Sequence, residues 1–310
     1  YGREHELEAD RLGAEYLART YYNPQAMLDV IGVLKNQEVF EVERAKAEGR
    51  EPRIYHGVFS THPDNDTRLQ EVVETAKALK SSGTVNYVGH EEYMKLIDGM
   101  VYGDSPREGI LRGRHFFHHD LNFSINFPNG WGVTNRPDRL LATAPGGAAV
   151  IQLNAEDINK KLSPREFMIQ RLGLSKLTEE AALNINGNPA HTAISVINTS
   201  EGQRPARFAV IYFEQRAYII AGITKVANDI GKYDQTILDT AKSFHALTER
   251  EKTLAKPLRL QVVQTDENTS FSELAQQSPL ESHAESQLRL LNAKYPDGPL
   301  RKGELIKVVE

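Results

Sequence analysis

The chain has 310 residues, of which 40% are hydrophobic and 25% are charged, and these ordinary values argue against wholesale disorder. Its length favours two or three domains, and its net charge of -5 gives no sign of the clustered basic surface of a nucleic-acid-binding protein. No apolar run approaches the roughly 18 residues of a membrane-spanning helix, and the absence of cysteine excludes disulfides and thiolate metal sites.

The first segment, residues 1–113, has the hydrophobic spacing of helices. Asn23 and Pro24 are predicted to be the N-cap and the first residue of the second helix, which ends near Gly49 and Pro52. Helices are predicted at residues 4–19, 24–48, 64–80 and 91–100.

In the second segment, residues 114–252, the hydrophobic period changes to two and turn residues multiply. Strands are predicted at residues 121–127, 140–144, 148–154, 191–198, 208–214 and 217–224. The last two are expected to form a hairpin around Gln215 and Arg216. Ser163 and Glu166 have the spacing of a capping box and predict a helix that begins there, and residues 230–244 predict another. This segment is predicted to be an antiparallel α+β domain.

The third segment, residues 253–310, follows a charged stretch, Glu249 to Lys256, that is interpreted as a linker. Strands are predicted at residues 258–264 and 305–309, with helices at 270–277 and 281–292 between them. The order is βααβ, so the predicted fold class of the whole chain is multidomain α+β.

Two carboxylates on the first predicted helix are the most specific candidates for chemistry. The segment Glu6-Leu7-Glu8-Ala9-Asp10-Arg11 places Glu6 and Asp10 one turn apart on one face, while Glu8 points elsewhere. One carboxylate that binds a metal and a second that orients a neighbouring ligand form a usual arrangement of metal centres. A solvated acidic face is the alternative, and two carboxylates cannot hold zinc by themselves.

Three motifs follow one another across about the first 80 residues. They are Glu6 to Arg11, Asn23-Pro24, and Thr61-His62-Pro63 with Arg68. In this order and spacing they resemble the second, helical half of the catalytic domain of the HtpX, BepA and CAAX prenyl protease group of zinc metallopeptidases, the gluzincins. The resemblance implies that Glu6 is the third zinc ligand and that Asp10 holds another ligand in place.

The same resemblance shows what these residues lack. In that group two histidines of an HExxH helix bind the single zinc ion, and the glutamate activates the metal-bound water. The 310 residues contain no HExxH, and His90-Glu91-Glu92-Tyr93-Met94 has no second histidine. The family pattern puts the motif upstream of the Glu6 helix. We therefore expect the C-terminal portion of a peptidase, with zinc absent or incompletely coordinated and no activity by itself.

His62 and Arg68 are the other candidates in the first segment. His62 precedes Pro63, which constrains the backbone, so its ring can be directed from a loop into a cleft. In relatives this histidine lies near the zinc, which implies a catalytic role in stabilising the oxyanion or in occupying the open metal position. A surface histidine is the alternative. Arg68 is expected to brace the loop, with substrate binding as its alternative role.

The run His115-Phe116-Phe117-His118-His119 is a further metal candidate. On a strand only residues two apart share a face, so His115 and His119 can align while His118 points away. We favour a junction segment with aromatic packing. Trp131 is expected to be a core residue at the start of the second domain.

The later segments resemble two accessory modules. Phe127 to Trp131, the hairpin strands and Thr240 to Phe244 are similar to the PsbP-like fold, whose members usually bind partners. Ser270 to Ala275, Leu288 to Asn292 and Leu300 to Val308 are similar to a LysM module, although the inter-helix segment departs from the usual Gly-rich glycan-binding loop.

Two functional hypotheses follow. In the first, the intact protein is a zinc endopeptidase of the bacterial envelope, periplasmic or secreted, acting on protein substrates such as misfolded envelope proteins. In the second, the chain is a non-catalytic module that binds peptidoglycan or a protein partner. The domains are expected at residues 1–113, 114–252 and 253–310.

Overall fold

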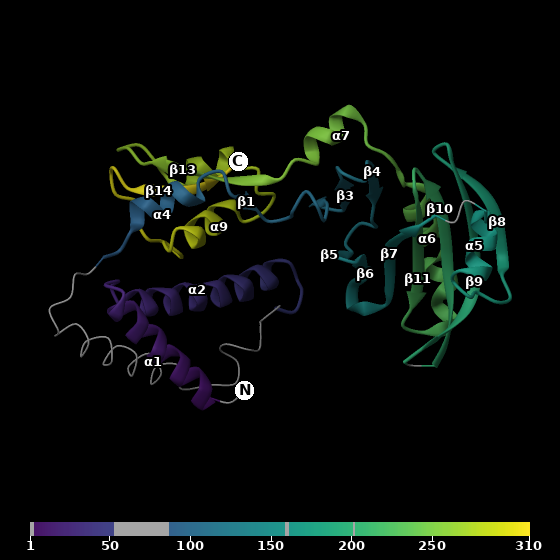
Figure 1. Cartoon of the computed structure of the whole chain (residues 1–310), viewed down its shortest axis with the longest axis horizontal. Helices are drawn as coiled ribbons and strands as arrows, with labels where there is room; N and C mark the ends of the chain where they lie inside the picture. Colours follow the sequence, from purple (N-terminus) through teal and green to yellow (C-terminus); the bar gives the residue numbers. More distant parts are fainter. Residues whose placement is uncertain (1–2, 53–86, 159–160, 201) are drawn as a thin grey trace. The chain divides into compact units, whose positions relative to one another are not determined.

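Helices occupy the beginning of the chain and antiparallel strands its middle, in the computed structural model shown in Figure 1. The structure describes residues 3–52, 87–158, 161–200 and 202–310. The chain divides into two compact units: unit 1 is Tyr1–Met100 with Leu258–Glu310, and unit 2 is Val101–Pro257. The fold is therefore α+β with several antiparallel sheets, as the sequence predicts.

Unit 1 combines N-terminal helices with the end of the chain. Its described elements are α1 (Arg3–Arg19), α2 (Ala26–Ala47), α4 (His90–Ile97), β13 (Leu258–Gln264), α8 (Phe271–Gln277), α9 (Ala284–Leu291) and β14 (Leu305–Val309). The predicted βααβ order of the last segment is confirmed, and β13 pairs antiparallel with β14 from Leu260↔Val309 to Gln264↔Leu305.

Asn292 fixes the end of α9 against β14. Its Nδ2 donates to the carbonyls of Leu288 and Lys307, both at 2.8 Å, and its Oδ1 accepts from the Lys307 N–H at 2.8 Å. One amide thus satisfies backbone groups of a helix and of a strand, which buried polar groups require. Phe271 of α8, Leu288 of α9 and Ile306 of β14 are buried.

Tyr295 connects this last segment to α2. Its carbonyl accepts from Asn36 Nδ2 at 3.1 Å, its ring lies 5.9 Å from that of Phe40, and its hydroxyl donates to the Glu43 carboxylate. Burial, and then the bond to Glu43, raise the pKa of Tyr295 to about 12. These contacts place the βααβ segment and α2 in the same unit.

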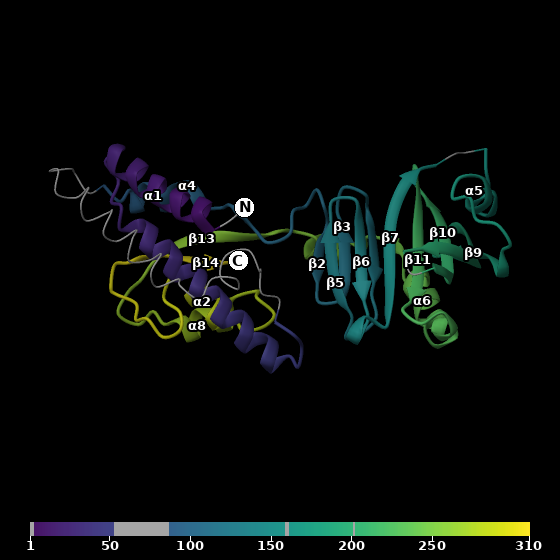
Figure 2. The same cartoon turned by 90° about the horizontal axis from the view of Figure 1, so that it is seen from below.

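Unit 2 is built on a seven-stranded antiparallel sheet with the order β5-β6-β7-β11-β10-β9-β8 (Figure 2). Its strands are β5 (Gly132–Arg136), β6 (Arg139–Thr143), β7 (Ala149–Asp157), β8 (Thr178–Ile185), β9 (Asn188–Thr199), β10 (Gly202–Phe213) and β11 (Arg216–Thr224). A smaller sheet contains β2 (Ile110–Arg112), β3 (His115–His118), β4 (Phe123–Asn126) and β12 (His245–Ala246), and β1 (Val101–Tyr102) begins the unit. The helices are α5 (Pro164–Gln170), α6 (Ile230–Lys242) and α7 (Glu249–Leu254).

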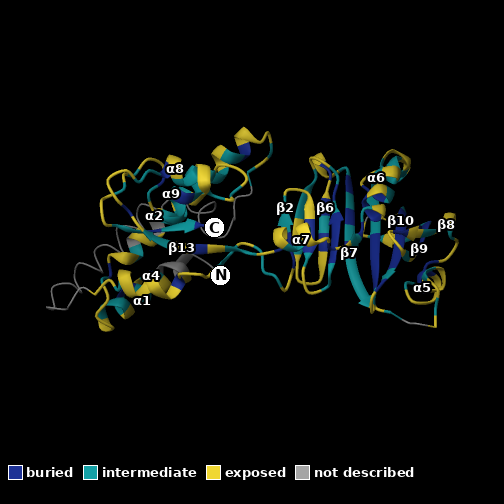
Figure 3. Ribbon diagram, turned by 90° about the horizontal axis from the view of Figure 1, so that it is seen from above, coloured by how far each residue is buried: buried dark blue, intermediate teal, exposed yellow. Residues whose placement is uncertain are grey.

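The central strands are buried on both faces of the large sheet (Figure 3). On β10, Ala209 and Ile211 pack with α6 and the aromatic residues of β3 and β4, while Phe208 and Val210 pack with α5. Because successive strand residues point to opposite faces, a nearly continuous apolar run serves two core layers.

Two local predictions in unit 2 are confirmed. The hairpin forms between β10 and β11, with Phe213 paired to Arg216 across Glu214 and Gln215. Glu214 adopts a φ of 52°, as a tight turn of this kind requires. Ser163 forms the predicted capping box with Glu166 at the start of α5.

The interpretation of Glu249 to Lys256 as a linker is wrong, because residues 249–254 form α7. Thr248 and Glu251 make a capping box at its start, and Glu251 also accepts from His245 Nε2 at 2.9 Å. Glu, Lys and Arg are all good helix formers, so a charged composition does not distinguish a linker from a solvated helix.

Glu180 of β8 is expected to make unit 2 sensitive to acid. Arg165 Nε donates to it at 2.7 Å and His191 Nε2 lies 3.1 Å from it; the bond from Arg165 first, then that from His191, lower its pKa from 4.5 to about 2. Because the folded pKa is depressed, this stabilisation is present above about pH 4.5 and is lost as the pH falls toward 2. Urea unfolding followed by Trp131 fluorescence should show a smaller loss over this range in Glu180→Gln than in the unaltered chain. An identical loss in both would contradict the assignment.

Candidate functional site

The described part of α1 carries two residues of the predicted metal site. The helix is continuous from Arg3 to Arg19, so Glu6 and Asp10 lie one turn apart on the same face. Asp10 is half-buried and interacts with a neighbouring group, whereas Glu8 is exposed. The helix therefore gives the two positions the relation that the spacing predicts.

Close packing against α2 holds α1 in place. A Cβ atom on Gly13 would lie 3.3 Å from Cε of Met27, so glycine allows the helix to approach that side chain. Ala14 beside it is fully buried. Gly13 therefore lets α1 lie close to the Met27 side chain of α2.

The prediction that Asn23 caps α2 is wrong by two residues. The N-cap is Gln25, and Ala26 begins the helix. Asn23 Oδ1 accepts from the Gln25 N–H at 3.1 Å, and the Asn23 carbonyl accepts from the Ala26 N–H at 3.1 Å. Asn23 and Pro24 therefore form a turn that leads into the helix, which is the other common use of an Asn side chain.

His62 and Arg68 lie outside the described residues, so the structure does not place them. The structure describes the backbone of Glu6 but not its side chain. The roles predicted for Glu6, Asp10, His62 and Arg68 stay predictions. Among the described residues, no three His, Asp or Glu side chains are grouped closely enough to hold a metal ion.

The histidines of β3 and of the residue that follows it have separate environments. His115 and His119 are exposed, and His119 Nδ1 lies 3.4 Å from Asp120. His118 Nδ1 accepts from the Leu121 N–H at 3.3 Å, and its ring also bonds the backbone of Arg107. Burial lowers the pKa of His118. These two bonds tie the His118 ring to the backbone around it.

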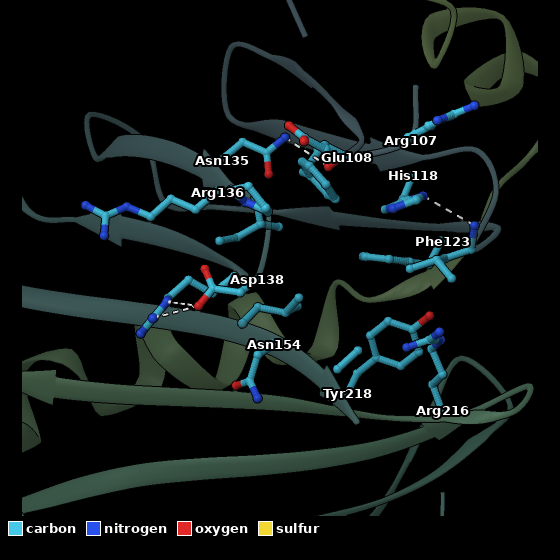
Figure 4. A pocket seen from close by; sticks show the side chains of 17 residues that line it. Arg107, Glu108, His118, Phe123, Asn135, Arg136, Asp138, Asn154, Arg216 and Tyr218 are labelled. Carbon is cyan, nitrogen blue, oxygen red and sulfur yellow. Dashed lines mark hydrogen bonds and ion pairs between the residues drawn. The ribbon is translucent and has the colours of Figure 1, made fainter. Parts of the chain in front are cut away.

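A pocket of about 340 Å³ lies in unit 2 where the small sheet meets the large one (Figure 4). Its walls come from β3, β4, β5, β6, β7, β11, the turn between β5 and β6, and the segment before β2. Phe116, Phe123 and Tyr218 form an apolar floor, with ring centroids 5.8 Å apart for the first two and 4.8 Å for Phe123 and Tyr218. Four arginines also line it: Arg107, Arg136, Arg139 and Arg216.

Sequence reasoning missed this pocket. It identified the strand that carries Tyr218 and placed Arg216 in the hairpin turn, but neither residue has a motif around it. The alternation of β11 was a usable signal, because Arg216 and Tyr218 are two apart and must share a face. The opposing Phe116 and Phe123 come from another sheet, whose position the sequence does not indicate.

Comparison with known proteins gives one family match. The family model of Peptidase family M48 matches residues 1–76. No curated protein is significantly similar to the chain. The described helices include none with the length and apolar character needed to cross a membrane.

Several solved structures are similar to part of the chain, at low sequence identity. PsbP of the cyanobacterium Synechocystis sp. has a TM-score of 0.34 and 13% identity, covering 47% of this chain and 98% of its own. The Ran-binding protein Mog1p of Saccharomyces cerevisiae has a TM-score of 0.33 and 11% identity, covering 44% and 96%. LpqN of Mycobacterium tuberculosis, involved in cell envelope biogenesis, has a TM-score of 0.28 and 10% identity, covering 39% and 78%.

Proposed function

We propose that residues 1–76 belong to the catalytic domain of a zinc-dependent endopeptidase, in which Glu6 is a metal ligand. The observation that carries the proposal is the match of this segment to Peptidase family M48, together with the helix that sets Glu6 and Asp10 one turn apart. A carboxylate from a helix is a common third protein ligand of catalytic zinc.

The donor set of the chain fits part of such a centre. Glu6 would bind the metal directly, and the half-buried Asp10, one turn along, would accept a hydrogen bond from a ligand and orient it. Zinc would supply a polarised carbonyl and an activated water in such a site. Since the 310 residues contain no HExxH, the two imidazole ligands and the general base would come from residues outside them.

His62 and Arg68 have supporting roles in this proposal. His62 would donate a hydrogen bond to the oxyanion that develops on the substrate carbonyl, a role that needs a ring on a loop. Arg68 would brace that loop. The substrates would be proteins, including misfolded proteins of the bacterial envelope, and the protein would act in the periplasm or outside the cell.

Exposed apolar side chains on the described helices of unit 1 support a role within a larger domain. Tyr16 on α1, Val30 and Val39 on α2, and Leu96 on α4 are each about half exposed or more, and Leu96 reaches 82%. In the proposed peptidase these side chains would contact the rest of the catalytic domain.

The remaining segments are proposed to be accessory modules. Residues 114–252 would form a PsbP-like domain and residues 253–310 a LysM-like domain. The motifs that the sequence shares with each of these folds support this assignment. The observed βααβ order and the place of Asn292 at the end of α9 support the second assignment. These modules would bind peptidoglycan or a protein partner.

Glu6→Gln tests the metal assignment in the protein expressed from the complete reading frame. The substitution removes the anionic ligand at nearly constant size, so zinc content per molecule and proteolytic activity should both fall, the metal content by about tenfold at limiting zinc. Atomic absorption after gel filtration measures the metal independently of activity.

Glu8→Gln is the matched control, because Glu8 is exposed on the same helix two residues away. It should leave zinc content unchanged. If Glu6→Gln retains the full metal stoichiometry, the ligand assignment is wrong, whatever happens to activity.

A further inference from the structure

The pocket of unit 2 contains polar groups for which the proposed peptidase has no use. We propose that it binds a small organic carboxylate with an aromatic or branched apolar group. Arg216 and Tyr218 would hold the carboxylate, and Phe116 and Phe123 would contact the apolar body. The inference concerns unit 2 alone and does not rest on the metal site.

The charge of the lining favours an anion. Its four arginines face two carboxylates, Glu108 and Asp138, so the lining carries two net positive charges when His118 is neutral. The whole chain carries a net charge of -5. A positively charged pocket in an acidic chain attracts anions, and this attraction weakens as the salt concentration rises.

Arg216 is the arginine best placed to meet a ligand. Arg107, Arg136 and Arg139 are exposed, and Arg139 is paired with Asp138 at 2.6 Å. In Figure 4 the side chains of Arg107 and Arg136 extend away from the centre, whereas the guanidinium of Arg216 lies beside Tyr218. Arg216 is half-buried and has no ion-pair partner among the described residues. A half-buried guanidinium that has no carboxylate partner is stabilised when a ligand supplies a carboxylate to pair with it.

Tyr218 supplies a second donor at the same corner. Its side chain is 2% exposed, yet no described residue hydrogen-bonds its hydroxyl, which points toward Arg216 in Figure 4. Burial raises the pKa of Tyr218, so the phenol stays protonated and can donate. The hydroxyl lines the pocket and is therefore open to a ligand. A carboxylate bridging the guanidinium and the phenol would satisfy both.

The rest of the pocket selects the body of the ligand. Phe116 and Phe123 are each 2% exposed, so only the faces and edges that line the pocket are accessible. His118 stacks on Phe123 with ring centroids 5.8 Å apart, so it adds an aromatic face to the lining. The volume of about 340 Å³ is at the small end of ligand sites and suits a single ring or branched chain. Arg216 is the one half-buried arginine of the lining, so the site offers a single sheltered cation, which favours a carboxylate over a phosphate dianion.

Isothermal titration calorimetry with the 310-residue chain and N-acetyl-L-phenylalanine tests the proposal. Its uncharged amide, N-acetyl-L-phenylalaninamide, should bind at least about tenfold more weakly, because a hydrogen-bonded charge is lost. Acetate, which lacks the ring, should bind far more weakly than either. Equal affinity for the acid and the amide, or no binding of the acid at millimolar concentration, would overturn the proposal.

Variants assign the binding to this pocket. Arg216→Gln should weaken binding of N-acetyl-L-phenylalanine by about tenfold or more, and Tyr218→Phe, which keeps the ring, by about fivefold. Arg250→Gln removes the same charge from exposed α7, outside the lining, and should bind as the unaltered chain does. Circular dichroism checks that each variant is folded. Full binding by a folded Arg216→Gln and Tyr218→Phe would also overturn the assignment.

A peptide that ends in phenylalanine with a free carboxylate separates two sources of this chemistry. Tighter binding of the peptide than of the single residue would identify a peptide C-terminus as the ligand. Equal or weaker binding would identify a free small carboxylate. In both cases Arg216→Gln should weaken the binding of the peptide as it weakens that of the single residue. If the peptide binds Arg216→Gln as tightly as it binds the unaltered chain, the site assignment is wrong.

Discussion

Replacing Arg207 with methionine should lower the free energy of unfolding of unit 2 by about 3–5 kcal/mol. Arg207 on β10 is 2% exposed, and its Nε and Nη2 donate to the two Asp234 oxygens at 2.6 and 2.9 Å. Its Nη1 donates to the Glu179 carbonyl at 2.8 Å. Methionine fills a similar volume but leaves the largely buried Asp234 carboxylate of α6 without its cation. The chain has a single tryptophan, Trp131 in unit 2, so urea unfolding followed by its fluorescence reports this unit.

The control for this prediction is Arg171→Met. Arg171 also pairs with a carboxylate, Glu156 at 3.1 Å, but its side chain is 65% exposed. Water and salt screen such a pair, so the substitution should cost no more than about 1 kcal/mol. Adding Asp234→Leu to Arg207→Met should restore part of the stability, because replacing both partners removes the uncompensated charge. If Arg207→Met and Arg171→Met had equal free energies of unfolding, burial of Arg207 would make no extra contribution to stability.

Gly109→Ala should destabilise unit 2 by about 2–5 kcal/mol, combining backbone strain and overpacking. Gly109 has a φ of 86°, in the left-handed region that L side chains rarely adopt. Its added Cβ would lie 2.1 Å from Cζ of Phe116, which is buried in the pocket floor. The ring would have to move, so the substitution should also weaken binding of N-acetyl-L-phenylalanine. Urea unfolding by Trp131 fluorescence measures the stability.

The variant Gly103→Ala separates backbone strain from overpacking as causes of the lost stability. Gly103 has a φ of 78°, but nothing lies within 4 Å of its added Cβ. This variant should lose only about 1–2 kcal/mol, the backbone share. In a Phe116→Leu background the cost of Gly109→Ala should shrink, because the two side chains are in direct contact. A cost that is independent of residue 116 would exclude the clash as its cause.

The sequence predicted those features that depend on neighbours along the chain. Ser163 and Glu166 are three residues apart and close a capping box, and the apolar run before Glu214 predicts a strand that turns back on itself. The helix that carries Glu6 and Asp10 follows from composition and spacing alone. In α7 the same reasoning failed, since charge is equally compatible with a loop and a helix.

By itself, then, the sequence determined the α+β class, the βααβ order of the last segment, and the one-turn relation of Glu6 to Asp10. Only the tertiary structure decided that Arg207 meets Asp234, 27 residues away, and that α2 packs against Tyr295. It also decided that Phe116 and Phe123 face Tyr218 across two sheets. The physical reason is that periodicity and capping act within a few residues, whereas these encounters depend on strand register and on which apolar faces pack together.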